Sequence, residues 1–193
     1  KSLIFGSGLI YVIIILMAHG ILRDGITTWM PSYINDVYQF GTSLSILNTA
    51  ILPIFSVISL SFASRLFKSV QNELKASAIL WSLGFISSFI FVFVYASQAF
   101  VSILMMALVT GCMHGVNLML IGVFPARFKD TGRVSTVSGL LNAFTYLGSA
   151  LSTYGIAAVS DHYGWKTTVL LWCIIACIGT LLSFVHFKKE KST

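Results

Sequence analysis

Residues 19–34, HGILRDGITTWMPSYI, place an arginine and an aspartate between an apolar run and a tail rich in Gly, Trp, Pro and Tyr. Residues 3–22 carry no Lys, Arg, Asp or Glu and are long enough to cross a bilayer as a helix. Either this span ends at residue 22, with Arg23 and Asp24 at its exit, or the helix continues through Tyr33 as a tilted or kinked span. In the second case Arg23 lies at membrane depth, where an arginine costs about 2.5–3.5 kcal/mol and is retained for a ligand or ion.

The composition of the whole chain indicates a membrane protein. Of the 193 residues, 56% are hydrophobic and only 9% are charged, and the mean hydropathy is +0.90. The hydrophobic fraction is higher, and the charged fraction lower, than in a soluble domain. The chain opens on lysine, and no small-residue cleavage site follows the first apolar run. We therefore expect a piece of a longer or processed chain rather than a signal peptide.

Hydropathy divides the chain into six predicted spans joined by short polar connectors. The spans cover residues 3–33, 42–67, 74–95, 99–123, 134–160 and 166–187. The longest polar connector, residues 125–133, lies between the fourth and the fifth span. The sequence thus predicts an all-α membrane protein that forms one six-helix bundle.

The basic residues predict how this bundle is oriented. Ten of the twelve Lys and Arg residues fall on the side of the termini, namely Lys1, Arg65, Lys68, Lys75, Arg127, Lys129, Arg133, Lys188, Lys189 and Lys191. Lys166 alone lies on the other side, and Arg23 lies within a span. This bias predicts a multi-pass protein of the cell membrane with both termini in the cytoplasm. The loop charges are interpreted as ion pairs or as a basic surface for anionic lipid, not as a nucleic-acid site.

Polar side chains within three spans fall on single helical faces. These stripes are His19, Arg23 and Thr27 in the first span, His114 and Asn117 in the fourth, and Asn142, Tyr146, Ser149 and Thr153 in the fifth. Together with an arginine, they favour a shared aqueous cavity that binds a small anion. Two other interpretations stay open. Small residues in the fifth span, and Gly111 with Gly115, can serve helix packing. His114 alone is more commonly a hydrogen-bonded buried histidine than a ligand or proton carrier.

The sequence offers no pattern that predicts an enzyme, a metal site or a cofactor. It has no metal-ligand spacing, no phosphate-binding glycine loop and no paired carboxylates. Residues 135–139, STVSG, lack the first glycine of the Gly-x-Ser-Gly nucleophile motif of six-span intramembrane serine proteases. We therefore expect a protein that binds a solute without transforming it.

Two segments carry a resemblance to a known family. Residues 23–33 read R-x-G-x-x-x-W-x-P-x-Y, which resembles the seventh span of the organophosphate:phosphate antiporters of the major facilitator superfamily. Residues 139–165 are similar to the eleventh span of that family and the turn that follows it, with Tyr-Leu-Gly-Ser at 146–149 and Gly164-Trp165. The resemblance covers the whole chain as the C-terminal six-span half of such a transporter.

The resemblance implies roles for individual residues. Arg23 matches the arginine that this half contributes to the phosphate site, and Tyr146 matches a pocket tyrosine. His114 stands where the family often has a tyrosine, and Asn48 stands about where the glycerol-3-phosphate branch has a glutamate. Residues 61–69, SFASRLFKS, lack the glycine and the aspartate of the superfamily's basic loop motif.

These observations predict half of a secondary transporter that moves a phosphorylated or other small organic anion by alternating access. Its partners would be the anionic solute, the lipid bilayer, and either a missing N-terminal half or a second copy of the chain. One alternative is a facilitator for a sugar acid, another carboxylate or a drug, in which Arg23 serves a carboxylate or pairs with Asp24. A further alternative is a membrane interaction module without a transport cycle.

Overall fold

The computed structural model describes residues 8–191, with side chains to residue 189, and this part of the chain contains helices and short turns but no strand. The elements are α1 (Leu9–Tyr38), α2 (Thr42–Asn48), α3 (Ile51–Val70), α4 (Glu73–Val94), α5 (Ala99–Asn117), the π-helical turn η1 (Leu118–Val123), the 3₁₀ segment η2 (Phe124–Thr131) and α6 (Val134–Lys191). The predicted all-α class is confirmed.

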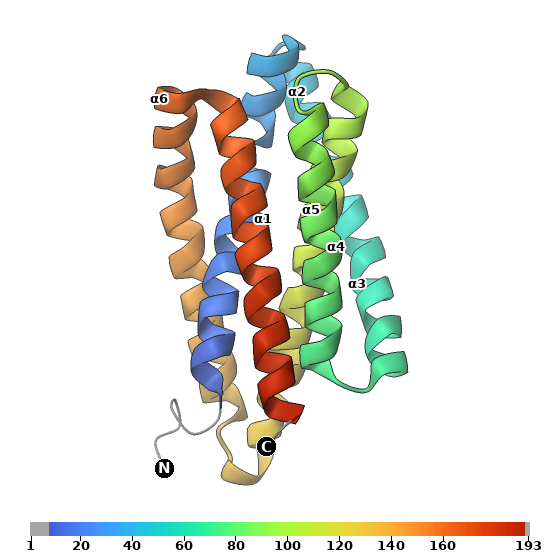
Figure 1. Cartoon of the computed structure of the whole chain (residues 1–193), viewed down its shortest axis with the longest axis vertical. Helices are drawn as coiled ribbons and strands as arrows, with labels where there is room; N and C mark the ends of the chain where they lie inside the picture. The colour runs from blue at the N-terminus through green and yellow to red at the C-terminus, as the bar shows by residue number, and fades with distance from the viewer. Residues whose placement is uncertain (1–7, 192–193) are drawn as a thin grey trace.

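Helix α6 consists of two helices that meet at Gly164. This glycine has φ 77° and ψ 171°, a conformation that only glycine adopts readily. The chain reverses there, so the two arms of α6 run in opposite directions (Figure 1). Five stretches are long and apolar enough to cross a membrane, and the fifth contains both arms: Leu9–Tyr38, Thr42–Val70, Glu73–Val94, Ala99–Thr131 and Val134–Lys189.

The observed helices refine the boundaries expected from the sequence. Helix α1 passes Arg23 and Pro31 without a break and ends at Tyr38, so the helix does not end at residue 22. Residues 3–7 of the expected first span lie outside the described residues. The expected second span is interrupted between α2 and α3, because residues 49 and 50 form a turn. Most of the expected polar connector 125–133 is the helical segment η2.

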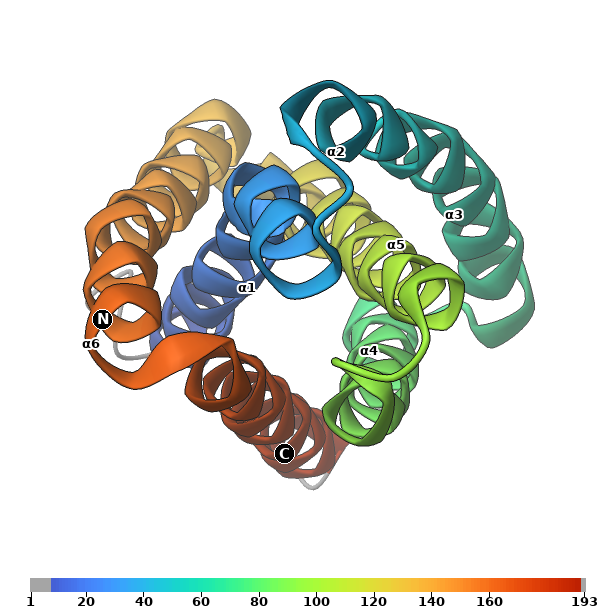
Figure 2. The same ribbon diagram turned by 90° about the horizontal axis from the view of Figure 1, so that it is seen from above.

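Helix α1 lies in the interior of the bundle. Viewed from above, it has the first arm of α6 on one side and α5 on the other, while α3 lies at the outer edge beyond α5 (Figure 2). Only Leu52 and Ala63 of α3 are buried. The apolar face of α3 is therefore open to lipid or to another bundle.

The backbones of α1 and α6 touch through glycines. A Cβ atom on Gly148 of α6 would overlap the carbonyl oxygen of Met17, and one on Gly20 would overlap the carbonyl oxygen of Thr145. Next to these contacts, the Ser152 hydroxyl donates a 2.9 Å hydrogen bond to the Ile21 carbonyl. Such close approach through small residues is a common way to join helices in lipid. It fixes the middle of α1 against the first arm of α6.

Tyrosines anchor the far end of α1 to the turn between α4 and α5. Tyr38 donates a 2.8 Å hydrogen bond to the Tyr95 carbonyl, and the fully buried Tyr33 donates to the same oxygen. Ser102 donates a 3.0 Å hydrogen bond to the Val94 carbonyl. The last carbonyls of a helix have no partner within it. These side chains satisfy such carbonyls at the end of α4.

The other end of the bundle carries the basic connectors. The helix ends and turns that contain most of the Lys and Arg residues lie at the end where the described chain begins and finishes (Figure 1). There Arg127 of η2 forms an ion pair with the largely buried Glu73 of α4. Asn72 accepts a 2.8 Å hydrogen bond from the Lys75 backbone and caps α4. One of the ion pairs expected for the loop charges is thus present.

Candidate functional site

Arg23 and Asp24 form a two-pronged ion pair in the middle of α1. The Arg23 Nε donates a 2.6 Å hydrogen bond to Asp24 Oδ1, and Nη2 donates a 2.8 Å bond to Oδ2. The side chains are 15% and 23% exposed, respectively. Both residues lie near the midpoint of the 30-residue helix, about 20 Å from either end. A charged pair therefore lies as far from both ends of the bundle as α1 allows.

Helix α6 supplies polar neighbours to this pair. The side chain of Ser149, which follows the tightly packed Gly148, lies close to the Asp24 carboxylate. On α1 itself, the Thr27 hydroxyl donates a 2.8 Å hydrogen bond to the Arg23 carbonyl and lies on the surface of the bundle. The pair is thus held between two helices and is open on the face that carries Thr27.

The two histidines of the predicted stripes have different surroundings. His19 is fully buried, and its Nε2 donates a 2.9 Å hydrogen bond to the Met113 carbonyl of α5. The sequence spacing places His19 on the same helical face as Arg23, but the hydrogen bond of His19 joins α1 to α5. His114 is half-buried, and its Nδ1 donates a 2.8 Å hydrogen bond to the Thr110 carbonyl. Its Nε2 has no hydrogen bond to the described residues.

The remaining predicted site residues lie on three other elements. Tyr146 of α6 is 60% exposed and stands one helical turn before Ser149. Asn117 is half-buried at the last residue of α5. Asn48, at the end of α2, donates a 2.8 Å hydrogen bond to the Leu44 carbonyl. The structure therefore brings together Arg23, Thr27 and the Ser149 face of α6, whereas Asn48 bonds within its own helix.

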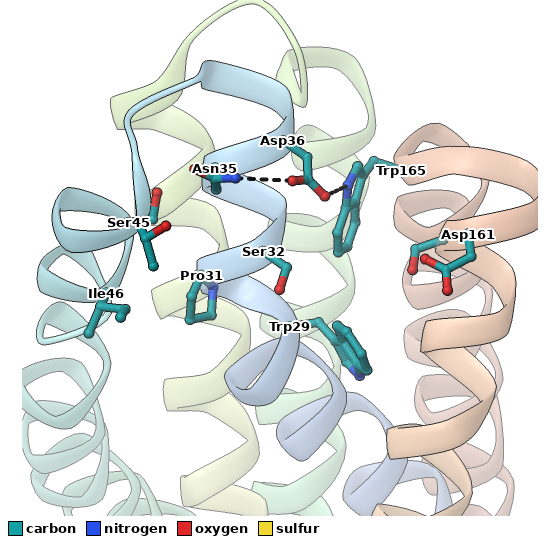
Figure 3. A pocket seen from close by; sticks show the side chains of 11 residues that line it. Trp29, Pro31, Ser32, Asn35, Asp36, Ser45, Ile46, Asp161 and Trp165 are labelled. Atoms are coloured by element: carbon teal, nitrogen blue, oxygen red, sulfur yellow. Dashed lines mark hydrogen bonds between the residues drawn. The ribbon is translucent and has the colours of Figure 1, made fainter.

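A separate cavity of about 390 Å³ lies at the end of the bundle opposite the basic connectors, between the ends of α1 and the first arm of α6 and the start of α2. Its lining residues include Trp29, Asp36, Ser45, Asp161 and Trp165. Trp165 donates a 3.1 Å hydrogen bond to Asp36, whose carboxylate points toward the indole (Figure 3). This bond ties the Gly164 turn to the end of α1.

Sequence reasoning did not find this cavity. Asp36 lies beyond the predicted end of the first span, at residue 33, so the sequence predicts a connector there and not a helix. For Trp165 the sequence predicts only a place in the turn after the fifth span. Among the side chains that the structure describes, residues 8–189, no group of three His, Cys, Asp or Glu is placed to hold a metal ion.

No protein-family model and no curated protein matches this sequence. Fold and site together define an all-helical protein with helices of membrane-spanning length and an ion pair near the middle of its central helix.

Proposed function

We propose that the chain is one half of a secondary transporter for a small organic anion, with a phosphate ester as the preferred class and Arg23 as the anion-binding group. The observation that carries the proposal is the largely buried Arg23–Asp24 pair near the midpoint of α1. In the middle of a bilayer such a pair is costly, and apolar side chains would pack there more favourably. Its presence is best explained by a charged solute.

The guanidinium suits an oxyanion because it presents several N–H donors in one plane and remains charged. Two of its five N–H groups are bonded to Asp24. Its other N–H groups have no hydrogen-bond partner among the residues that the structure describes. A second pair of donors is therefore available for two oxygens of a phosphate or carboxylate.

The surrounding surface supports a binding face shared with another bundle. Thr27 of α1 and Tyr146 of α6 are exposed in this chain, although both are polar groups near the middle of membrane-length helices. Polar side chains in the membrane face protein or water rather than lipid. We therefore propose that a second six-helix bundle, from the same polypeptide or from a second copy, covers this face.

In this proposal the anion binds between two bundles near the middle of the bilayer, and rocking of one bundle against the other exposes it alternately to each side. The chain would then be the C-terminal half of a major facilitator transporter, as the resemblance of residues 23–33 implies. The basic connectors at one end would face the cytoplasm. No chemical transformation of the solute is involved.

A ligand-dependent thermal shift on the purified full-length protein tests the proposal. Glycerol 3-phosphate should raise the melting temperature, because a ligand that binds only the folded state stabilises it. Gluconate, a carboxylate of similar size, should raise it less. The variant Arg23→Lys should need about 10 to 100 times more ester for the same rise in melting temperature. This factor corresponds to losing one charge-assisted hydrogen bond of about 1.5–3 kcal/mol.

Arg65→Lys is the matched control, since Arg65 is an exposed arginine near the end of α3. It should leave the ester's effect unchanged. A larger shift with gluconate would favour the second candidate, a carboxylate transporter, which the natural pairing of Arg23 with the Asp24 carboxylate also suits. No shift with either compound would refute both and leave a membrane interaction module.

A further inference from the structure

The cavity at the end of the bundle opposite the basic connectors has two carboxylates in its wall and no Lys or Arg among its lining residues. Asp36 belongs to α1 and Asp161 to the first arm of α6. Asp36 accepts hydrogen bonds from the neutral groups of Trp165 and Asn35. Asp161 forms no hydrogen bond or ion pair with the other described residues. Two negative charges therefore face one cavity of about 390 Å³ without a cation to balance them.

The charged groups near this end of the bundle do not supply that balance. Lys166 and His162 of α6 are exposed, do not line the cavity, and form no ion pair among the described residues. Helix α2 and the turn between α4 and α5 contain no charged side chain. On α1, Arg23 lies about 20 Å before Asp36 along the helix and is already paired with Asp24.

A buried hydroxyl in the wall of the same cavity lacks a partner. Ser45 of α2 is 1% exposed and lines the cavity, yet its Oγ forms no hydrogen bond with the described residues. Figure 3 shows Ser45 and Asp161 on opposite sides of the cavity, with Ser32 and Asp36 of α1 between them. Buried polar groups without a partner are uncommon in folded proteins. A bound molecule with an N–H donor would satisfy this hydroxyl.

The shape and lining of the cavity suit an organic ammonium ion better than a metal ion. Its volume of about 390 Å³ falls within the range of small-molecule sites. The indoles of Trp29 and Trp165 form part of the wall, and the faces of such rings attract ammonium groups. Among the described side chains, no third His, Cys, Asp or Glu joins the two carboxylates to hold a metal.

We propose that this cavity binds an organic ammonium ion, preferably a diamine, between Asp36 and Asp161. The two ammonium groups of a diamine balance the two carboxylates, so the occupied cavity carries no net charge. One ammonium N–H donates to the Ser45 hydroxyl, and the carbon chain packs against the indoles. Because the cavity lies about 20 Å from Arg23, this site does not depend on the proposed function.

Calorimetric titration of the full-length protein with putrescine, 1,4-diaminobutane, at pH 7 tests the inference. Both amino groups are protonated at this pH, as in a lysine side chain. One putrescine should bind per chain with a Kd below about 1 mM. The monoamine 1-aminobutane should bind about 10-fold more weakly, and 1,4-butanediol, which has the same length and no charge, should not bind. Binding should also change the tryptophan fluorescence, since Trp29 and Trp165 line the cavity.

Three variants locate the site. Asp161→Asn should weaken putrescine binding about 10- to 100-fold, because a charge-assisted hydrogen bond is lost. Ser45→Ala should weaken it about 2- to 10-fold without lowering the melting temperature of the ligand-free protein, because the hydroxyl has no partner to lose. Asp130→Asn is the matched control, since it removes an exposed carboxylate from η2 at the opposite end, and it should leave binding unchanged.

The outcomes also separate this inference from the proposed function. Failure of putrescine to bind in a saturable way, equal binding of 1,4-butanediol, or binding that Asp161→Asn leaves unchanged would each overturn the inference. A response to Mg²⁺ but not to putrescine would overturn it in favour of a metal site. Arg23→Lys should bind putrescine as the wild type does, so putrescine binding stands or falls independently of the experiments with glycerol 3-phosphate.

Discussion

Replacing Gly148 with alanine should separate the two helices that hold the candidate site. The added Cβ would overlap the Met17 carbonyl oxygen and would lie only 3.0 Å from its carbon and 3.1 Å from the Met17 Cα. These atoms belong to the backbone of α1 and cannot rotate away. Overpacking of this kind costs about 1–3 kcal/mol, against a gain of up to about 1 kcal/mol from the better helix propensity of alanine.

Gly155→Ala on the same arm of α6 is the control for propensity, because no atom lies within 4 Å of its added Cβ. We expect Gly148→Ala to be less stable than Gly155→Ala by about 1–3 kcal/mol. For a chain of this size that difference lowers the melting temperature by about 2–4 °C per kcal/mol, which a thermal unfolding scan in detergent detects. Equal melting temperatures for the two variants would refute the close contact of α1 with α6.

Three further predictions test other parts of the account. Tyr33→Phe should lower the free energy of unfolding by about 1 kcal/mol in a denaturant titration, because a buried hydroxyl loses its bond to the Tyr95 carbonyl; an unchanged value would contradict that bond. Glu73→Gln should lower the free energy of unfolding by about 1–3 kcal/mol in the same assay. The double variant Glu73→Gln with Arg127→Gln should lose less than the two single variants lose together, whereas strict additivity would argue against the ion pair. Tyr146→Ala should change stability by less than about 0.5 kcal/mol but weaken binding of the ester, so an unchanged ligand-dependent thermal shift would remove this exposed tyrosine from the site.

The helical fold was accessible from the sequence because hydropathy directly reports membrane-length helices. The predicted start and end of the third span, residues 74–95, differ by one residue from α4. The turn between α2 and α3 escaped prediction, since its residues, Thr49 and Ala50, carry no strong breaking signal. The end of α1 at Tyr38 was missed because Asn35 and Asp36 look like a connector, whereas tertiary contacts with the Tyr95 carbonyl extend the helix.

The candidate site was only partly predictable. Spacing along one helix predicted that His19 lies on the same face as Arg23. Spacing cannot show that the Met113 carbonyl of α5 lies on that side, and the hydrogen bond to this carbonyl gives His19 a role in packing α1 against α5. The pairing of Arg23 with Asp24 was one of two alternatives in the sequence, and side-chain geometry was needed to choose it. The position of Ser149 beside Asp24 depends on how closely α6 approaches α1.

The central claim is that Arg23 binds the transported anion, and uptake of radiolabelled glycerol 3-phosphate into proteoliposomes tests it most directly. The full-length wild type should accumulate the ester, and Arg23→Lys should lower the initial rate about 10- to 100-fold at equal amounts of inserted protein. Transport by Arg23→Lys at the wild-type rate would contradict the claim.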